Sequence, residues 1–227
     1  DMTRKILLWG GGRKARIIEA MIAEAGLGDV AIIFDNTLAA PPFETRAIFI
    51  NDVSELKKRL GQLTHQVVCI GSEHGYARWK TAACLAELGL RPITLVHDAS
   101  FIDPTATLGE GCQVMPRAVV HKFTEIGEQS ILNTNCVIDH DCVVGKGVHV
   151  MGAAAIAGMV EIGDFATIGT NATVFPYVKI GEGAFIGAGA LVRESVEPYT
   201  VHVGVPARFS RKIEPKFYED ALIELRR

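Results

Sequence analysis

The fold of this chain is decided by the stretch LNTNCVIDHDCVVGKGVHV, residues 132–150, in which an aliphatic residue returns at every sixth position. The same spacing runs without a break from Ile102 to about Glu197. Its aliphatic residues are Ile102, Leu108, Val114, Val120, Ile126, Leu132, Ile138, Val144, Val150, Ile156, Ile162, Ile168, Val174, Ile180, Ile186 and Val192. Six is not a helical period, so the stretch is a hexapeptide repeat.

Such a repeat predicts short strands that wind into a solenoid, with each aliphatic residue pointing inward and stacking on its equivalents in neighbouring coils. Three hexapeptides per coil give a triangular prism of about 18 residues per turn. Small or β-branched residues four positions after the aliphatic ones, such as Thr124 and Cys142, fit a narrow interior. Gly and Asn tolerate corner conformations, and we place at corners Gly163, Gly169, Asn171 and Gly187. A sandwich of short strands is disfavoured, because sandwiches do not keep an unbroken register.

The composition fits a soluble protein with room for two modest domains. The chain has 227 residues, a mass of 24.5 kDa, a net charge of −3 and a pI near 6.2. This balance gives no electrostatic footprint for nucleic acid, and no apolar run approaches the ~20 residues of a membrane span. The first residues lack a signal-peptide pattern, so we expect a cytoplasmic protein. The Cys residues form no CxxC pair and are expected to be reduced packing thiols.

The first hundred residues predict a small α/β unit with a glycine-rich turn. The expected elements are a strand at residues 5–9, a helix that includes residues 17–25 and stops near Gly26, a strand at 30–34, a helix at 53–60, a strand at 66–70, a helix at 76–88 and a strand at 93–96. Gly10, Gly12 and Ala15 fit G-x-G-x-x-A, and Asp35 occupies the acidic position after the second strand. Such glycines let a phosphate approach a helix N-terminus, and the acidic residue reaches a ribose hydroxyl. The motif by itself fits a phosphate-binding loop and a merely tight turn equally well.

These patterns predict that the chain is divided into three parts. The N-terminal unit has about four strands and no second mononucleotide half, so it suits a mononucleotide or a nucleotide-sugar better than a dinucleotide. We expect a Rossmann-like domain at residues 1–98, a β-helix at residues 99–200, and a C-terminal tail at residues 201–227. The tail from Lys212 onward is expected to form a short helix that closes the open end of the solenoid.

One hexapeptide of the repeat carries a candidate catalytic group. Asp139 and Asp141 flank His140. A carboxylate fixes the tautomer of an imidazole and favours the imidazolium, so His140 fits a general base, while a surface His on an outward corner fits the same pattern. His149 occupies another polar position. No two of the seven His residues share a column of the 18-residue coil, so zinc within one subunit is not indicated, and a metal shared between subunits stays open.

A longer run, ILNTNCVIDHDCVVG at residues 131–145, is followed by His149, by Ala157-Gly158 and by Gly-Val-Pro-Ala at residues 204–207. With these features the chain resembles the left-handed β-helix nucleotide-sugar N-acetyltransferases of the bacillosamine and perosamine type. The resemblance covers essentially the whole chain. It also supplies the left hand of the helix, since generic connection rules favour right-handed crossovers.

The resemblance implies an enzyme that transfers acetyl from acetyl-CoA to the amino group of a UDP-, GDP- or dTDP-linked deoxyamino sugar, in bacterial surface-glycan or glycoprotein biosynthesis such as that of lipopolysaccharide O-antigen. It makes His140 the base that takes a proton from the sugar amine, and Asp141 the residue that orients it. An N–H near Gly158 would stabilise the oxyanion, by about 3 kcal/mol per donor. It further implies a homotrimer with coenzyme A between two prisms, and no metal. The implied acetyl-CoA residues are His149, Gly158, Thr170, Gly187, Pro206 and Arg208.

By the same resemblance the N-terminal domain holds the nucleotide. The implied residues are Gly10, Gly12, Arg13 and Lys14 at the diphosphate, Asp35 and Asn36 near the base or ribose, Gly71 and Ser72 closing the pocket, and Asn133 near the amino sugar. The chain departs from the family at Arg13-Lys14, where a Gly or Ser followed by His is usual. Two cations at this loop can still hold a diphosphate.

Two other function classes stay open at the level of sequence. One is acyl transfer with a different acceptor or donor, as in an O-acetyltransferase or an enzyme that uses succinyl-CoA or an acyl carrier protein. The other is a metal-dependent hydratase of the trimeric β-helix type, or a non-catalytic binding protein built on the same prism. The first is disfavoured for small acceptors, which do not need a phosphate loop, and the second needs His residues that converge across a subunit interface.

Overall fold

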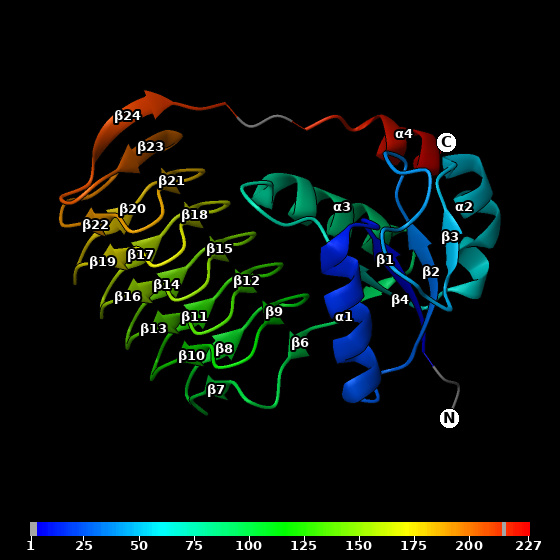
Figure 1. Ribbon diagram of the computed structural model, residues 1–227, viewed down its shortest axis with the longest axis horizontal. Coiled ribbons are helices and arrows are strands. Elements are labelled where there is room, and N and C mark those ends of the chain that lie inside the picture. Colours follow the sequence, from blue (N-terminus) through cyan, green and yellow to red (C-terminus); the bar gives the residue numbers. More distant parts are fainter. Residues whose placement is uncertain (1–3, 215–216) are drawn as a thin grey trace. The chain divides into compact units, whose positions relative to one another are not determined.

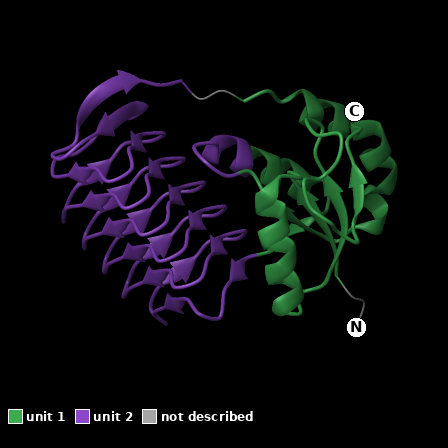
Figure 2. Cartoon of the chain, viewed as in Figure 1, with its two compact units in different colours: residues 1–70, 80–93, 217–227 green, residues 71–79, 94–216 purple. Residues whose placement is uncertain are grey.

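The chain folds into two compact units, which the computed structural model describes over residues 4–214 and 217–227. Unit 1 comprises Asp1–Ile70, Lys80–Ile93 and Phe217–Arg227, and unit 2 comprises Gly71–Trp79 and Thr94–Lys216 (Figure 2). Helix α3 (Gly75–Glu87) begins in unit 2 and continues in unit 1.

Unit 2 is a β-helix, and Figure 1 shows its short strands stacked coil upon coil from β7 to β22. Val119 pairs in parallel with Val137, and Val137 with Ala155, so equivalent strands lie 18 residues apart. This spacing confirms three hexapeptides per coil. The three sheets of the β-helix are named here by their number of strands. The six-stranded sheet contains β7 (Phe101–Ile102), β10 (Val119–Val120), β13 (Val137–Ile138), β16 (Ala155–Ile156), β19 (Thr173–Val174) and β22 (Leu191–Val192).

The other two sheets repeat the pattern. The five-stranded sheet contains β8 (Thr107–Leu108), β11 (Glu125–Ile126), β14 (Val143–Val144), β17 (Glu161–Ile162) and β20 (Lys179–Ile180). The eight-stranded sheet contains β6 (Leu95–Val96), β9 (Gln113–Val114), β12 (Ile131–Leu132), β15 (His149–Val150), β18 (Thr167–Ile168), β21 (Phe185–Ile186), β23 (Thr200–Val203) and β24 (Arg208–Lys212). Every strand from β7 to β22 ends on one of the sixth-position aliphatic residues.

The aliphatic residues form the core that the repeat predicts. From Val114 to Val192 they are all buried, while Ile102 and Leu108 in the first coil are partly buried. Residues four positions later, such as Thr124 and Cys142, are completely buried beside them. Stacking in register therefore gives one continuous apolar column along the prism.

The corners need two kinds of special residue. Three positions after each aliphatic residue from Leu108 to Ile186 the backbone has positive φ, as at Asn171 (φ 57°), which agrees with the prediction for this residue. Gly169 stands one position after its aliphatic residue, and its φ is not positive. A Cβ on Gly169 would lie 2.5 Å from the Ile186 carbonyl oxygen, so the glycine permits close approach of the next coil. The expectation that Gly163, Gly169 and Gly187 serve corner conformation is therefore wrong in its reason, because all three are needed for space.

The C-terminal segment divides between the units. Strand β23 pairs in parallel with β21 and in antiparallel with β24, so this hairpin extends the eight-stranded sheet. Helix α4 (Asp220–Arg226) instead buries Leu222 and Leu225 in the core of unit 1, together with Leu56. The prediction that this helix closes the solenoid is wrong, because its apolar side chains complete the other core. Residues 215–216 of the predicted tail lie outside the described residues.

Unit 1 is built on a five-stranded parallel sheet with the order β3-β2-β1-β4-β5. Its elements are β1 (Lys5–Trp9), α1 (Arg13–Glu24), β2 (Asp29–Phe34), β3 (Ile48–Ile50), α2 (Val53–Arg59), a 3₁₀ turn (Leu60–Gln62), β4 (His65–Val68), the end of α3 and β5 (Arg91–Pro92). Strand β3 was not predicted, because three residues are too short to show a period. Of the strand expected at residues 93–96, only residues 95–96 form a strand, β6, and it joins the β-helix, while β5 lies before the expected range and joins this sheet.

Candidate active site

His140 lies at the corner that joins β13 of the six-stranded sheet to β14 of the five-stranded sheet. Its Nδ1 is 2.8 Å from Oδ2 of Asp141, and both side chains are about half exposed. A carboxylate oxygen accepts hydrogen bonds, so Nδ1 carries the proton and Nε2 keeps its lone pair. Asp139 stabilises the turn by accepting a 2.7 Å hydrogen bond from the His140 backbone N–H. The predicted pair of His140 and Asp141 thus has the geometry of an oriented base.

Gly158 stands directly beside the unprotonated nitrogen of His140. It occupies the same corner one coil further on, and a Cβ added to it would lie 2.7 Å from His140 Nε2. Only a glycine therefore leaves Nε2 open on this side. No described residue accepts a hydrogen bond from the Gly158 N–H, so this donor remains available beside the imidazole.

A second histidine adjoins this corner from the preceding coil. The rings of His121 and His140 meet edge to face with centroids 6.4 Å apart. Nδ1 of His121 lies 3.5 Å from Oδ1 of Asp139, the carboxylate that holds the His140 turn. Lys122, the next residue, pairs with Asp103 at 3.1 Å. The hydrogen bonds from Thr105, together with Lys122, lower the pKa of the Asp103 carboxyl to about 2, so this pair is ionised near neutral pH.

His149 belongs to a different face of the prism. It is buried at the start of β15 in the eight-stranded sheet, where its Nδ1 lies 3.0 Å from the backbone carbonyl oxygen of Ser72. Because a carbonyl only accepts, Nδ1 is the donor and Nε2 faces the Asn133 amide at 3.5 Å. The structure therefore brings together His149, Asn133 and Ser72. Within one chain it does not bring them to the corner of His140.

The other residues expected at acetyl-CoA are spread over the later coils. Thr170 and Gly187 lie at the corner where the eight-stranded sheet passes into the six-stranded sheet, and Thr170 is exposed. Pro206 and Arg208 are exposed near the β23–β24 hairpin, and the Val205-Pro206 peptide bond is cis. A pocket of about 170 Å³ lies there, lined by Val192, Arg193, Glu194, Ser195, Val196, His202, Ala207, Arg208 and Phe209.

The glycine-rich turn of unit 1 is held by Asp35. One oxygen of Asp35 accepts the Gly11 N–H at 2.8 Å, and the other accepts both the N–H and the hydroxyl of Thr37. Gly10 has a positive φ of 104° and donates its N–H to the Phe34 carbonyl. In the structure, the carboxylate of Asp35 thus shapes the loop. Gly12 caps helix α1 without a side chain, and Arg13 and Asn36 are exposed nearby while Lys14 is partly buried.

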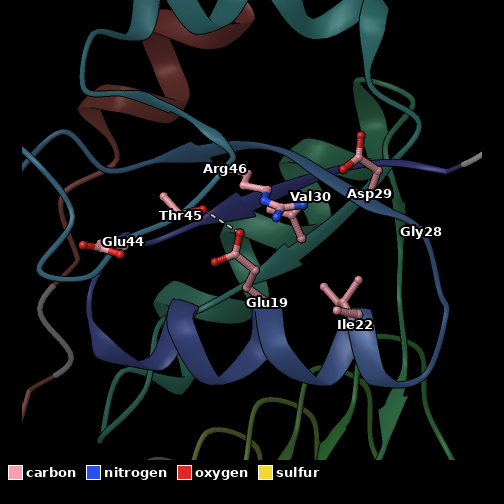
Figure 3. Close-up of a pocket in the computed structure, with 9 residues that line it drawn as sticks. Glu19, Ile22, Gly28, Asp29, Val30, Glu44, Thr45 and Arg46 are labelled. Carbon is pink, nitrogen blue, oxygen red and sulfur yellow. Dashed lines mark hydrogen bonds between the residues drawn. The ribbon is translucent and has the colours of Figure 1, made fainter.

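A hollow of unit 1 lies at the end of its strands opposite to the glycine-rich turn. It has a volume of about 540 Å³ and is lined by Glu19, Ile22, Ala23, Gly28, Asp29, Val30, Glu44, Thr45 and Arg46 (Figure 3). Asp29 begins β2, whereas Asp35 follows its end. In Figure 3 the Glu19 side chain points from α1 toward Thr45, whose hydroxyl donates a 2.6 Å hydrogen bond to it. None of the predicted site residues lines this hollow.

Sequence reasoning missed Arg78, a fully buried cation in unit 2. Its guanidinium donates 2.7 Å hydrogen bonds to the backbone carbonyls of Gln129 and Gly147. Burial lowers the pKa of Arg78 to about 10, so it remains a cation at neutral pH. Beside it Trp79 donates to Glu128 and packs under the Lys146 ammonium, 4.0 Å from the ring centre. These contacts fix residues 71–79, including Ser72, against the β-helix.

Burial affects the reactivity of the thiols. Burial raises the pKa of Cys69 and Cys136 to about 12 and that of Cys112 to about 11, so these thiols are poor nucleophiles. Within residues 4–214 and 217–227 no group of three or more His, Cys, Asp or Glu side chains is arranged to hold a metal ion. None of the helices described in the structure is long and apolar enough to span a membrane.

Comparison with known proteins places this geometry in context. No protein-family model and no curated protein matches the chain. Among solved structures, the acetyltransferase domain of PglB from Neisseria gonorrhoeae FA1090 in complex with acetyl coenzyme A and WeeI from Acinetobacter baumannii AYE each match with a TM-score of 0.80 and 24% identity. Both matches cover 92% of this chain and 100% of the other. The stacked parallel strands thus have the fold of the left-handed β-helix acetyltransferases.

A more specific likeness follows within that class. PerB from Caulobacter crescentus, in complex with CoA and GDP-perosamine, matches with a TM-score of 0.83 and 29% identity over 91% of this chain and 97% of that chain. A His-to-Ala variant of GDP-perosamine N-acetyltransferase from the same organism, also in complex with CoA and GDP-perosamine, matches with a TM-score of 0.82. This chain is therefore similar to sugar N-acetyltransferases over most of its length.

Proposed function

We propose that this protein is an acetyl-CoA-dependent N-acetyltransferase that acylates the amino group of a nucleotide-linked deoxyamino sugar. The observation that carries the proposal is the corner where His140, oriented by Asp141 at 2.8 Å, turns its unprotonated Nε2 toward Gly158. That corner lies in a fold shared with an enzyme crystallised with CoA and GDP-perosamine. Acetyl-CoA is then the donor substrate, and the chemistry needs only groups of this chain.

The reaction can be written with the residues of this corner. The sugar amine attacks the thioester carbonyl carbon, and His140 Nε2 takes the proton that the nitrogen loses. Asp141 stabilises the imidazolium that forms. The Gly158 N–H is the donor that can stabilise the oxyanion of the tetrahedral intermediate. Collapse of the intermediate breaks the carbon–sulfur bond and leaves the acetamido sugar, and the departing coenzyme A thiolate takes the proton from the His140 imidazolium, which restores the base.

In this proposal the Rossmann-like domain predicted for residues 1–98 binds the nucleotide through unit 1, to which residues 1–70 and 80–93 of this range belong. The sheet order β3-β2-β1-β4-β5 supports it, since ligands of doubly wound sheets bind at the carboxyl ends of the strands, where the order reverses. The glycine-rich turn lies at that end, between β1 and α1. Gly10, Gly12, Arg13 and Lys14 would contact the diphosphate, with Asp35 and Asn36 near the ribose or base. The proposed nucleotide-sugar contacts in unit 2 are Gly71 and Ser72, with Asn133 for the amino sugar.

The proposal also includes a homotrimer with coenzyme A bound between neighbouring copies. Its support is the outer face of the six-stranded sheet, where Phe101 and Val137 are exposed and Ala155 and Leu191 continue the apolar row. The corner of His140 borders this face on one side, and the corner of Thr170 and Gly187 borders it on the other. If two copies pack along this face, the corner of His140 in one copy and the corner of Thr170 and Gly187 in the other would therefore line one groove.

Replacement of His140 tests the proposed function. Purified wild-type protein is expected to release coenzyme A when it is given acetyl-CoA and a GDP-, UDP- or dTDP-linked 4-amino sugar. His140→Ala should lower kcat by about a hundredfold or more, because the proton acceptor is lost. The measurement is release of free thiol, with mass spectrometry of the acetylated sugar, and circular dichroism to verify the fold. A folded His140→Ala protein with unimpaired turnover would remove His140 from this role.

A further inference from the structure

The reactive corner is supported from inside the prism by buried hydrogen-bonding atoms. Thr124 is completely buried one coil before His140. Its hydroxyl donates a 2.7 Å hydrogen bond to the Asp139 carbonyl and accepts a 3.1 Å hydrogen bond from the Cys142 N–H. One hydroxyl therefore fixes both ends of the turn that carries His140 and Asp141.

The next residue in the same column repeats this contact one coil later. Cys142 lies directly above Thr124, and its Sγ is 3.2 Å from the Ala157 carbonyl, adjacent to Gly158. In the following coils the column continues with Val160 and Val178, which have no hydrogen-bonding side-chain atom. Hydrogen-bonding side chains in this column are therefore found at Thr124 and Cys142, which contact the turns of His140 and Gly158, and not in the coils that follow.

Ser130 makes the same two kinds of hydrogen bond at a corner that does not carry the proposed base. Ser130 donates a 3.0 Å hydrogen bond to the Gly145 carbonyl and accepts a 3.1 Å hydrogen bond from the Val148 N–H. It therefore braces the turn at residues 145–148 in the way that Thr124 braces the turn at residues 139–142. A comparison of variants at Thr124 and Ser130 therefore separates a general effect on the stability of the solenoid from a specific effect on the orientation of His140.

We infer that Thr124 is a positioning residue for His140. The inference rests on the proposed function only for its kinetic consequence. Its structural content is that the Thr124 hydroxyl sets the direction of the His140 ring by fixing both ends of its turn. Since Asp141 lies within that turn, loss of the hydroxyl also loosens the 2.8 Å contact between Asp141 and His140.

The test compares Thr124→Val with Ser130→Ala. Valine already occupies this column at Val160 and Val178, so the fold should accept it. Thr124→Ser keeps the hydroxyl, and Thr124→Cys supplies the thiol that Cys142 uses. Crystal structures should show the 139–142 turn displaced and the His140–Asp141 contact broken in Thr124→Val, but unchanged in Ser130→Ala and Thr124→Ser.

Kinetic measurements on the same variants give a second test of the role of Thr124. For Thr124→Val we expect kcat to fall about ten- to a hundredfold with little change in KM for acetyl-CoA, since a small misplacement of the base slows the chemical step. Thr124→Ser should restore kcat, Thr124→Cys should lie between, and Ser130→Ala should stay close to wild type. If Thr124→Val does not fold, Thr124→Cys provides the comparison.

An unmoved turn in Thr124→Val overturns the inference whether or not the protein is an acetyltransferase. Equal losses of kcat in Thr124→Val and Ser130→Ala would also overturn it, because they would show a general effect on the solenoid. A wild-type protein without acetyl transfer would instead overturn the proposed function, and the two crystal structures would still decide the role of Thr124.

Discussion

At the scale of single residues, the corner of His140 depends on the presence of a glycine at position 158. Gly158 has no Cβ, and one placed there would lie 2.7 Å from Nε2 of His140. The imidazole could escape only by turning, which would break its hydrogen bond to Asp141. Gly152 occupies the same position of its own hexapeptide, and a Cβ there would meet only the Thr134 carbonyl, at an ordinary 3.4 Å.

These two glycines form a matched pair of variants. Gly158→Ala is expected to lower kcat by about ten- to a hundredfold, because the methyl group displaces the ring from the amine. Gly152→Ala should leave kcat close to wild type. Both should fold, since neither glycine has a positive φ. The measurement is steady-state acetyl transfer for both proteins, and equal activity of the two variants would contradict the proposed orientation of Nε2.

The candidate base could be predicted from sequence because charged residues interrupt an apolar repeat at His140. The supports of this base could not. Thr124 is indistinguishable from other small residues until the coil places its hydroxyl beside the Asp139 carbonyl, 15 residues later. The motif predicts a ribose contact for Asp35, whereas the hydrogen bond from the Gly11 N–H to Asp35 is seen only in the structure.

At the scale of elements, the start of α3 is attached to the β-helix through Arg78. This guanidinium is fully buried and donates to the backbone carbonyls of Gln129 and Gly147, two successive turns of the β-helix. No sequence period could predict it, because its acceptors are backbone atoms 51 and 69 residues away. The same segment carries the Ser72 carbonyl that holds His149.

Removal of Arg78 should therefore cost stability. Arg78→Met leaves the carbonyls of Gln129 and Gly147 without this donor, and we expect the free energy of unfolding to fall by about 3 kcal/mol. Arg211→Met, which removes an exposed arginine from β24, should change it by less than about 0.5 kcal/mol. Urea denaturation followed by circular dichroism measures both. Similar unfolding free energies for the two variants would show that the buried guanidinium is not an anchor.

The elements themselves were predictable to different degrees. The strands of the β-helix follow from the six-residue period, since each ends on an aliphatic residue that must be buried. Short strands outside the period were not predictable, as β3 shows. The predicted placement of α4 against the solenoid was wrong. The apolar residues Leu222 and Leu225 indicate that the helix packs against a core, but the sequence does not indicate which core.

At the scale of the whole molecule, the two exposed faces of the prism differ in character. Along the six-stranded sheet the outward residues include Phe101 and Val137, while along the five-stranded sheet Glu125, Glu161 and Lys179 interrupt the row. An apolar sheet face of this kind is typical of a surface buried between subunits. The charged face is typical of a surface in contact with water.

The proposed trimer gives a prediction for these faces. Light scattering of the wild-type protein should give three times the 24.5 kDa mass of one chain. Val137→Glu should reduce the mass toward that of one chain, because it places a charge in the apolar face. Val143→Glu, on the five-stranded sheet, should leave the trimer intact. A wild-type monomer would contradict the shared groove, and so would dissociation by Val143→Glu alone.

The most direct test of the central claim is a crystal structure with coenzyme A and a nucleotide-linked 4-amino sugar. The proposed mechanism predicts that the sugar nitrogen lies about 3 Å from His140 Nε2, within hydrogen-bonding reach. It also predicts that the coenzyme A sulfur lies beside Gly158. A structure with both ligands bound in which the sulfur and the amine lie away from the corner of His140 would contradict the proposed mechanism.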